Sequence, residues 1–405
     1  MDLLESVKMA VTTLTANKLR SSLTMLGIII GNASVIAMVG IGQGAQKYAA
    51  EQFESLGPNV LFIVPGSREA QRSTFEVPKT LVLADARAIA TQVPSVNAVA
   101  PQINSQQLVT YLNKNTNSII IGTTPEFLTA RDFEVGKGRF ISELDLERNN
   151  QVVALGAEIA EKLFGSEEAV GKQIRIKNVS FQVVGVMEAK GAFLGNNQDD
   201  TLYIPLTTMS SRIVGRTSPY GIDLTFIVAS AKNEKSVEAA QFQITNLLRL
   251  RHKINGDDDF TVQTQKDALK VVGNVTGALT IMLAAIAGIS LFVGGVGIMN
   301  IMLVSVRERT HEIGLRKAIG ATQQDILVQF MIESVILAAL GGAIGTLIGV
   351  GGIGLVGAVT PLKAGVSPIA ILVAVGVSGG IGLFFGVVPA RQAAKLDPIV
   401  ALRSA

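Results

Sequence analysis

Long apolar runs and one long polar stretch divide this chain. Four runs reach the ~20 residues that a helix needs to cross the apolar core of a bilayer, and they cover residues 23–42, 275–304, 326–355 and 369–388. The stretch between the first two runs has the mixed composition of a globular domain. The pattern therefore predicts a membrane α-helical protein with four transmembrane helices and one large domain outside the bilayer.

Strand-like and helix-like patterns follow one another in the polar stretch. Residues 171–189 (GKQIRIKNVSFQVVGVMEA) alternate as a hairpin does, and residues 236–252 have the period of an amphipathic helix. Strand–helix–strand segments at both ends are expected to pair into one subdomain. The hairpin-rich middle is expected to form an inserted second one, so the domain is predicted to be α/β with two subdomains.

Both flanking spans are expected to continue as helices beyond their apolar runs. Ala45, Tyr48, Ala49 and Phe53 recur at helical spacing after the first run, and Gly57-Pro58 should end that extension. These two extensions predict a short helical stalk that carries the α/β domain. The amphipathic residues before the first span are expected to be either an interfacial helix or a simple leader to the span.

The predicted organisation has six parts. They are a cytoplasmic amphipathic helix (1–20), the first span and stalk (21–57), the extracytoplasmic domain (58–265) with an inserted subdomain at about 124–219, the second stalk and span (266–306), a cytoplasmic coupling segment (307–325), and the third and fourth spans with a cytoplasmic tail (326–405).

Basic residues mark one side of the membrane. They cluster before the first run, directly after the second and after the fourth, whereas the loop 360–368 holds a single Lys. The positive-inside rule then places both termini and the coupling segment in the cytoplasm, and the α/β domain outside an inner membrane. A signal peptide is the alternative for the first run, but its length and the lack of a small-x-small site favour an uncleaved span. The net charge of +3 indicates no nucleic-acid partner.

Motifs for catalysis are scarce. The segment GSEEAVGKQ (165–173) approaches a phosphate-binding loop, but it has five residues between the glycines and Gln after Lys. His252 is expected to be solvated at a helix end, and Asp257 to Asp259 to form an exposed turn rather than a metal site. With no Cys, the outer domain must be held together by its core. The chain is thus expected to be no enzyme and to bind no cofactor or metal.

Glycines recur every four residues in the last two spans, at Gly341, Gly345 and Gly349 and at Gly376 and Gly380. Small residues at this spacing let helices approach closely in lipid. A pore lining is the alternative, but it needs polar side chains along a water-filled path, and these spans offer few. The glycines are therefore predicted to be helix-packing positions.

The coupling segment combines both charges with apolar residues. Residues 305–319 are predicted to be one helix in which Glu312 pairs with Arg316 and Gly320 is the C-terminal cap. An apolar centre with a charged rim is typical of a protein contact. A basic anchor on lipid headgroups remains the alternative, although Glu308 and Glu312 are unfavourable beside an anionic leaflet.

Three segments resemble MacB-type permeases (a MacB/FtsX-like family) of the ABC transporter superfamily. They are residues 18–45, residues 294–321 (GGVGIMNIMLVSVRERTHEIGLRKAIGA) and residues 388–403 (VPARQAAKLDPIVALR). The resemblance implies a homodimer of four-span subunits with two copies of an ABC ATPase, whose ATP-driven motion the membrane helices transmit to the outer domain for efflux of a drug, peptide or lipid-like substrate. It implies that the ATPase is a separate chain holding ATP and magnesium, with a periplasmic adaptor and outer-membrane channel as further partners left open.

The resemblance also assigns the residues that contact the ATPase. They are Arg307, Glu308, Arg309, Thr310, Glu312, Ile313, Arg316, Lys317, Ala318, Ile319 and Gly320. The alternatives within the superfamily are a relative that extracts lipoproteins and one that regulates a cell-wall hydrolase. A sensor receptor is a further alternative, but the cytoplasmic segments are too short for a signalling domain.

Overall fold

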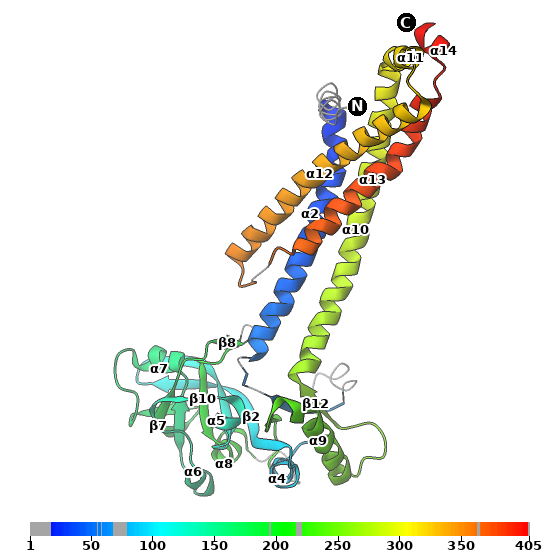
Figure 1. Cartoon of the computed structure of the whole chain (residues 1–405). Coiled ribbons are helices and arrows are strands. Elements are labelled where there is room, and N and C mark those ends of the chain that lie inside the picture. The colour runs from blue at the N-terminus through cyan, green and yellow to red at the C-terminus, as the bar shows by residue number, and fades with distance from the viewer. Residues whose placement is uncertain are drawn as a thin grey trace. The chain divides into compact units, whose positions relative to one another are not determined.

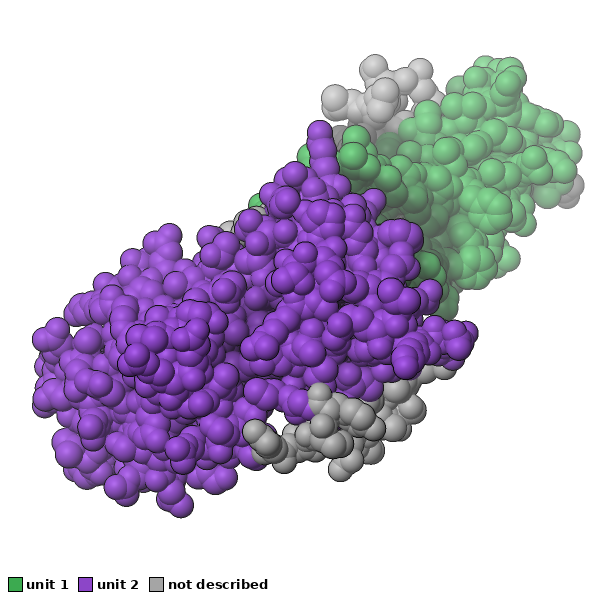
Figure 2. Space-filling model, turned by 90° about the horizontal axis from the view of Figure 1, so that it is seen from below, with its two compact units in different colours: residues 1–48, 272–405 green, residues 49–271 purple. Residues whose placement is uncertain are grey.

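The computed structural model describes residues 18–54, 56–57, 59–67, 79–193, 196–215, 221–362 and 365–403. Residues 1–17 of the predicted N-terminal helix lie outside them. The chain divides into two compact units, which Figure 2 colours separately. We call Met1–Tyr48 with Val272–Ala405 the membrane unit, and Ala49–Val271 the α/β unit.

Four long helices form the membrane unit and confirm the predicted spans (Figure 1). They are α2 (Lys18–Glu54), α10 (Gln265–Glu308), α12 (Gln323–Val359) and α13 (Pro368–Lys395). Each contains a segment apolar enough to cross a bilayer. As predicted, α2 continues past its apolar run to Glu54. Two short helices, α11 (Thr310–Ala318) and α14 (Pro398–Arg403), accompany them.

One large mixed sheet carries the α/β unit. Its strands lie in the order β12-β1-β11-β2-β3-β10-β5-β7-β4, with β6 pairing to β2 and β7. The strands are β1 (Val60–Pro65), β2 (Val96–Tyr111), β3 (Lys114–Thr123), β4 (Val135–Gly138), β5 (Val152–Leu155), β6 (Gln173–Ile176), β7 (Val179–Met187), β10 (Thr201–Pro205), β11 (Phe226–Ala231) and β12 (Phe260–Thr264), and the separate pair is β8 (Ala192–Phe193) with β9 (Asn196–Asn197). The helices are α4 (Leu83–Gln92), α5 (Phe127–Arg131), α6 (Glu143–Glu147), α7 (Ala157–Phe164), α8 (Leu206–Thr208) and α9 (Val237–His252).

Strand β2 joins the two predicted subdomains. Its first half pairs with β11, for example Ala100 with Val228, and its second half pairs with β3 and β6. The hairpin β6–β7 forms as predicted, with Ile174 opposite Phe181. The boundary predicted near residue 124 falls directly after β3, which pairs in parallel with β10 of the predicted insertion. One continuous sheet therefore includes strands from both predicted subdomains.

A single apolar cluster fills the α/β unit, as a domain without cysteine requires. In the second subdomain its centre is aromatic. Tyr203 is 2% exposed, and its ring centroid lies 5.0 Å from that of Phe127 and 6.0 Å from that of Phe133. Rings at such separations add favourable edge contacts to the area that they bury.

The prediction that His252 is solvated is wrong. Its side chain is 11% exposed and lies between two carboxylates, with Nδ1 2.8 Å from Asp259 Oδ1 and Nε2 3.3 Å from Asp85 Oδ2. Arg251 Nε also donates to Asp85 Oδ1, at 2.9 Å. The contact with Asp85 raises the pKa of His252 to about 9 against the opposing effect of burial, and Asp259 adds to the rise. This ionic cluster joins the end of α9 to the start of α4.

We expect the stability of the α/β unit to fall as pH rises above neutrality. Because the folded pKa of His252 is raised, its stabilisation is complete below about 6.5 and is lost as pH rises through about 9. The loss should be of the order of 1–3 kcal/mol. Melting temperatures of the detergent-solubilised chain at pH 6, 7.5 and 9 measure it. His252→Gln should flatten the profile, and an equal decline in this variant would contradict the assignment.

Candidate functional site

The coupling segment bends where α10 passes into α11. Helix α10 ends at Glu308, and Arg309 has φ −103° and ψ 17° before α11 begins at Thr310. The prediction of one helix over 305–319 is therefore wrong, since two helices meet at Arg309. The Thr310 hydroxyl donates to the carbonyls of Val306 (3.1 Å) and Arg307 (2.9 Å), a type of back-bonding that bends helices.

A tight turn separates α11 from α12. Gly320 has φ +113°, and the amides of Ala321 and Gly320 donate to the carbonyls of Arg316 (3.0 Å) and Lys317 (3.2 Å). These two bonds form a Schellman motif, as the Gly320 cap predicts. Thr322 and Asp325 then form a reciprocal capping box at the start of α12. The ends of both helices are thus fixed by local hydrogen bonds.

One face of α11 is clamped to the rest of the membrane unit. Ile313 is 3% exposed within the apolar cluster of the helical bundle. Lys317 Nζ donates to the carbonyls of Ala394 (2.6 Å) and Leu396 (2.7 Å) at the end of α13. Arg316 bonds to Gln329 on α12, and Gly314 lies against Ala401 on α14. Figure 1 shows α11 and α14 side by side. A displacement of α11 must therefore displace the ends of α12 and α13.

Other residues of α11 and its flanks are exposed in the described part of the chain. Leu315 is 52% and Ile319 80% exposed, and Glu308 and Glu312 are exposed as well. Glu312 Oε1 accepts a 2.7 Å bond from Arg316, the pair that the sequence predicts. We call the exposed residues between Arg307 and Gly320 the docking surface, which consists of Arg307, Glu308, His311, Glu312, Leu315, Ala318, Ile319 and Gly320.

The structure divides the predicted contact residues into two groups. Six of them lie on the docking surface, namely Arg307, Glu308, Glu312, Ala318, Ile319 and Gly320, whereas Arg309, Thr310, Arg316 and Lys317 are half-buried and Ile313 is buried. The second group contacts the bundle, so its members fix the orientation of α11.

Sequence reasoning did not predict α14 as part of this end of the unit. Helix α14 packs on α11, and Ile399 (70%) and Val400 (64%) are exposed. They add exposed apolar surface on α14, which lies beside α11 in Figure 1. The signal was present in LDPIVALR, because Asp397 caps α14 through a 2.8 Å bond from the Ile399 amide and Pro398 is its first residue.

The predicted packing glycines have different surroundings. A Cβ at Gly345 would lie 2.7 Å from the carbonyl oxygen of Ile29 on α2, and Gly341 and Gly349 also face α2. A Cβ at Gly376 or Gly380 would meet nothing within 4 Å. The first set therefore lies at the α12–α2 contact, and the second set faces open space in the single chain.

The near-miss phosphate loop has the wrong order of elements. Gly165 follows the end of α7, and Gln173 begins β6. A phosphate-binding loop runs from a strand into a helix, so that the helix N-terminus faces the anion. This segment runs from a helix into a strand, so it offers no such cradle.

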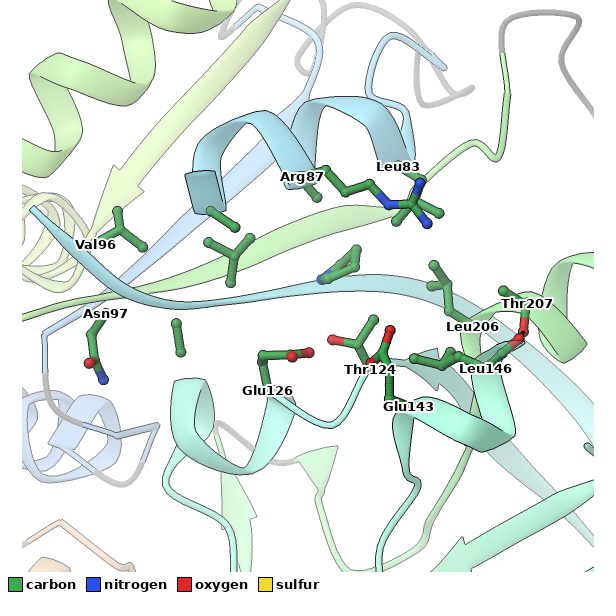
Figure 3. Close-up of a pocket in the computed structure, with 15 residues that line it drawn as sticks. Leu83, Arg87, Val96, Asn97, Thr124, Glu126, Glu143, Leu146, Leu206 and Thr207 are labelled. Atoms are coloured by element: carbon green, nitrogen blue, oxygen red, sulfur yellow. Dashed lines mark hydrogen bonds between the residues drawn. The ribbon is translucent and has the colours of Figure 1, made fainter. Parts of the chain in front are cut away.

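A cleft in the α/β unit is the second feature of interest (Figure 3). It has a volume of about 270 Å³ and is lined from α4 and β2 on one side and from α6 and α8 on the other. Arg87 extends from α4, whereas Glu126 and Glu143 lie on the other side of the space. Apolar side chains such as Val99 and Leu146 complete the lining. The cleft has the mixed lining of a binding pocket.

Two family models match the chain. Residues 21–247 match the MacB-like periplasmic core domain, and residues 284–398 match the FtsX-like permease C-terminal domain. The curated relatives include the macrolide export ATP-binding/permease protein MacB of Azoarcus sp., 40% identical over 100% of this chain and 60% of the relative. The protein of the same name from Bdellovibrio bacteriovorus is 37% identical over 99% of this chain and 62% of its own.

Two solved structures of extracytoplasmic regions are similar to part of this chain. The periplasmic region of MacB from Actinobacillus actinomycetemcomitans is 22% identical, covers 56% of this chain and 98% of that one, and has a TM-score of 0.47. The extracellular domain of the noncanonic ABC-type transporter YknZ from Gram-positive bacteria is 16% identical, covers 51% of this chain and 100% of that one, and has a TM-score of 0.41.

The match extends over the whole chain, although the chain spans only about three fifths of the length of these curated relatives. The family models assign the α/β unit to the extracytoplasmic side and the last three spans to a permease domain. Of the three segments named for the resemblance, residues 21–45, 294–321 and 388–398 lie inside these matches. The chain belongs to the MacB-type, FtsX-like family of ABC transporter permeases.

Proposed function

We propose that this chain is the permease subunit of an ABC exporter and that its docking surface binds a separate ATPase. Two copies of the chain and two ATPase subunits would form the complex, with the ATPases holding ATP and magnesium in the cytoplasm together with both chain termini. ATP-driven motion of the ATPases would move the extracytoplasmic domain and expel a substrate from the periplasmic side.

The architecture of α11 is the observation that carries this proposal. One face is held by Arg316, Lys317 and Ile313, and the other presents exposed charged and apolar residues. A surface with an apolar centre and a charged rim suits a protein partner. Because the clamp joins α11 to α12 and α13, a force applied to the surface is transmitted to the spans. A lipid anchor would not need this rigid attachment.

The interior of the bundle supports mechanical transmission over passage of substrate. In the part of the bundle that the structure describes, the buried polar side chains are Asn32, Ser305, Gln329, Glu333, Ser334 and Ser378. Asn32 Nδ2 donates to Ser378 Oγ at 2.6 Å, so this pair is engaged within the bundle. A water-filled path requires many polar side chains along its length. Stiff helices such as α10, which is continuous from Gln265 to Glu308, suit transmission instead.

Co-expression with an ABC ATPase encoded beside this chain tests the proposal. We expect a detergent-stable complex with equal numbers of the two subunits, which hydrolyses ATP when reconstituted in lipid. The ATPase with its catalytic lysine replaced should still bind but not hydrolyse ATP. If no ATPase from the same genome binds the purified chain, the proposed function is wrong.

A further inference from the structure

A carboxylate lies inside the bundle at the level of the docking surface. The side chain of Glu333 on α12 is 1% exposed. In the described part of the bundle, it is the one buried carboxylate among the buried polar side chains. A buried charge in a span is unfavourable without partners and usually marks a functional position. The side chains that contact Glu333 therefore indicate its role.

Those partners form a continuous path from the surface to the interior. Glu312 Oε1 on the docking surface accepts from Arg316 Nη2 at 2.7 Å. Arg316 Nη1 donates to Gln329 Oε1 at 2.8 Å, and Gln329 Nε2 donates to Glu333 Oε1 at 3.3 Å. Arg309 Nη1 lies 3.6 Å from the same Glu333 oxygen. We call these five residues the polar relay.

The relay joins the three helices that meet at the coupling segment. Arg309 occupies the bend between α10 and α11, Arg316 and Glu312 belong to α11, and Gln329 and Glu333 belong to α12. Two cations face two carboxylates, so the group is electrically balanced. Each of the inner members is at most partly exposed, and electrostatic contacts in such surroundings are stronger than in water. A change at Glu312 can thus reach Glu333 through a few hydrogen bonds.

We infer that Glu333 is a positioning residue that makes α10, α11 and α12 respond together when a partner binds Glu312. This inference rests on the proposed function, because the partner is the ATPase at the docking surface. A cationic group of the partner at Glu312 competes for that carboxylate and frees Arg316. The hydrogen bonds that Arg316 and Gln329 make then rearrange around Glu333, and the bend at Arg309 adjusts with them. The relay therefore couples docking to the angle between α11 and the spans.

Distance measurements on the complex in lipid nanodiscs test the inference. The chain has no native cysteine, so Val275→Cys on α10 and Val359→Cys at the far end of α12 accept spin labels selectively, and both positions are exposed and lie outside the docking surface. In the otherwise unchanged chain, ATP should shift the distance distribution. In Glu333→Gln, which keeps the shape of the side chain, ATPase binding should stay within about threefold and the shifted population should fall at least about tenfold. An unchanged shift in this variant would overturn the inference.

A second variant and a control separate coupling from folding. Arg309→Gln should reduce the shift as Glu333→Gln does, and the double variant should be no worse than either single one, because they remove the same ion pair. Additive losses would overturn the inference even if Glu333→Gln lowers the melting temperature. Ser378→Ala, which removes a buried hydrogen bond elsewhere in the bundle, should leave the shift intact. A chain that binds no ATPase at all would instead overturn the proposed function.

Discussion

Replacing Glu308 and Glu312 together by lysine is expected to weaken ATPase binding by about 100-fold, which corresponds to ~1.4 kcal/mol for each site. Both side chains are exposed on the docking surface, where charges set complementarity with a partner. Reversal replaces attraction with repulsion for any cation of the ATPase that faces them. Titration of the detergent-solubilised chain with labelled ATPase measures the change in affinity.

Matched variants identify the cause of that loss. Glu161→Lys reverses an exposed charge on α7 of the α/β unit and should leave ATPase binding unchanged. Glu308→Lys alone should account for about half of the lost binding free energy, because Glu308 lies outside the polar relay. Membrane insertion should be normal in all three. If the double variant binds as tightly as the unchanged chain, the contact lies elsewhere and the docking surface is misassigned.

Local signals in the sequence predicted the elements of this site well. Gly320 was predicted as the cap of α11 because a helix end of this kind depends only on neighbouring residues. The Glu312–Arg316 pair also depends only on helical spacing. The apolar runs also predicted the four transmembrane helices, because the thickness of a bilayer sets the length that such a helix needs.

Long-range contacts were not predictable from one sequence. The orientation of α11 depends on Gln329, Ala394 and Ala401, which are distant along the chain, so sequence alone could not separate inward from outward contact residues. The sequence also did not predict that β2 pairs first with β11 and then with β3, because a strand can change partners without any break in its pattern. His252 likewise pairs with Asp85 from a different helix.

The glycines of α12 and α13 show what a spacing pattern predicts and what it leaves undetermined. Spacing by four predicts close helix contact, but it does not say which helix is the partner. The structure places Gly345 against Ile29 and Asn32 of α2, and it places Gly380 in open space. The same sequence signal thus has two structural outcomes, which a pair of identical substitutions can distinguish.

Gly345→Leu is expected to destabilise the membrane unit by about 3 kcal/mol or more, because overpacking of a tight contact commonly costs 1–3 kcal/mol and the neighbour here is rigid. Its Cβ would lie 2.7 Å from the Ile29 carbonyl oxygen and 3.0 Å from the Ile29 Cα. These are backbone atoms that cannot rotate away, so α12 and α2 must separate. A lower melting temperature of the chain in detergent measures the effect.

Gly380→Leu is the matched control, since a Cβ at Gly380 meets nothing within 4 Å in the single chain. The substitution replaces glycine in an apolar helix, where leucine has the higher helix propensity, so stability should be unchanged or slightly higher. Equal destabilisation by both variants would contradict the α12–α2 contact as the cause. If Gly380→Leu instead leaves the melting temperature intact but abolishes dimerisation, its face of α13 is the contact with the second copy in the proposed homodimer. The two substitutions thus separate packing within one subunit from packing between subunits.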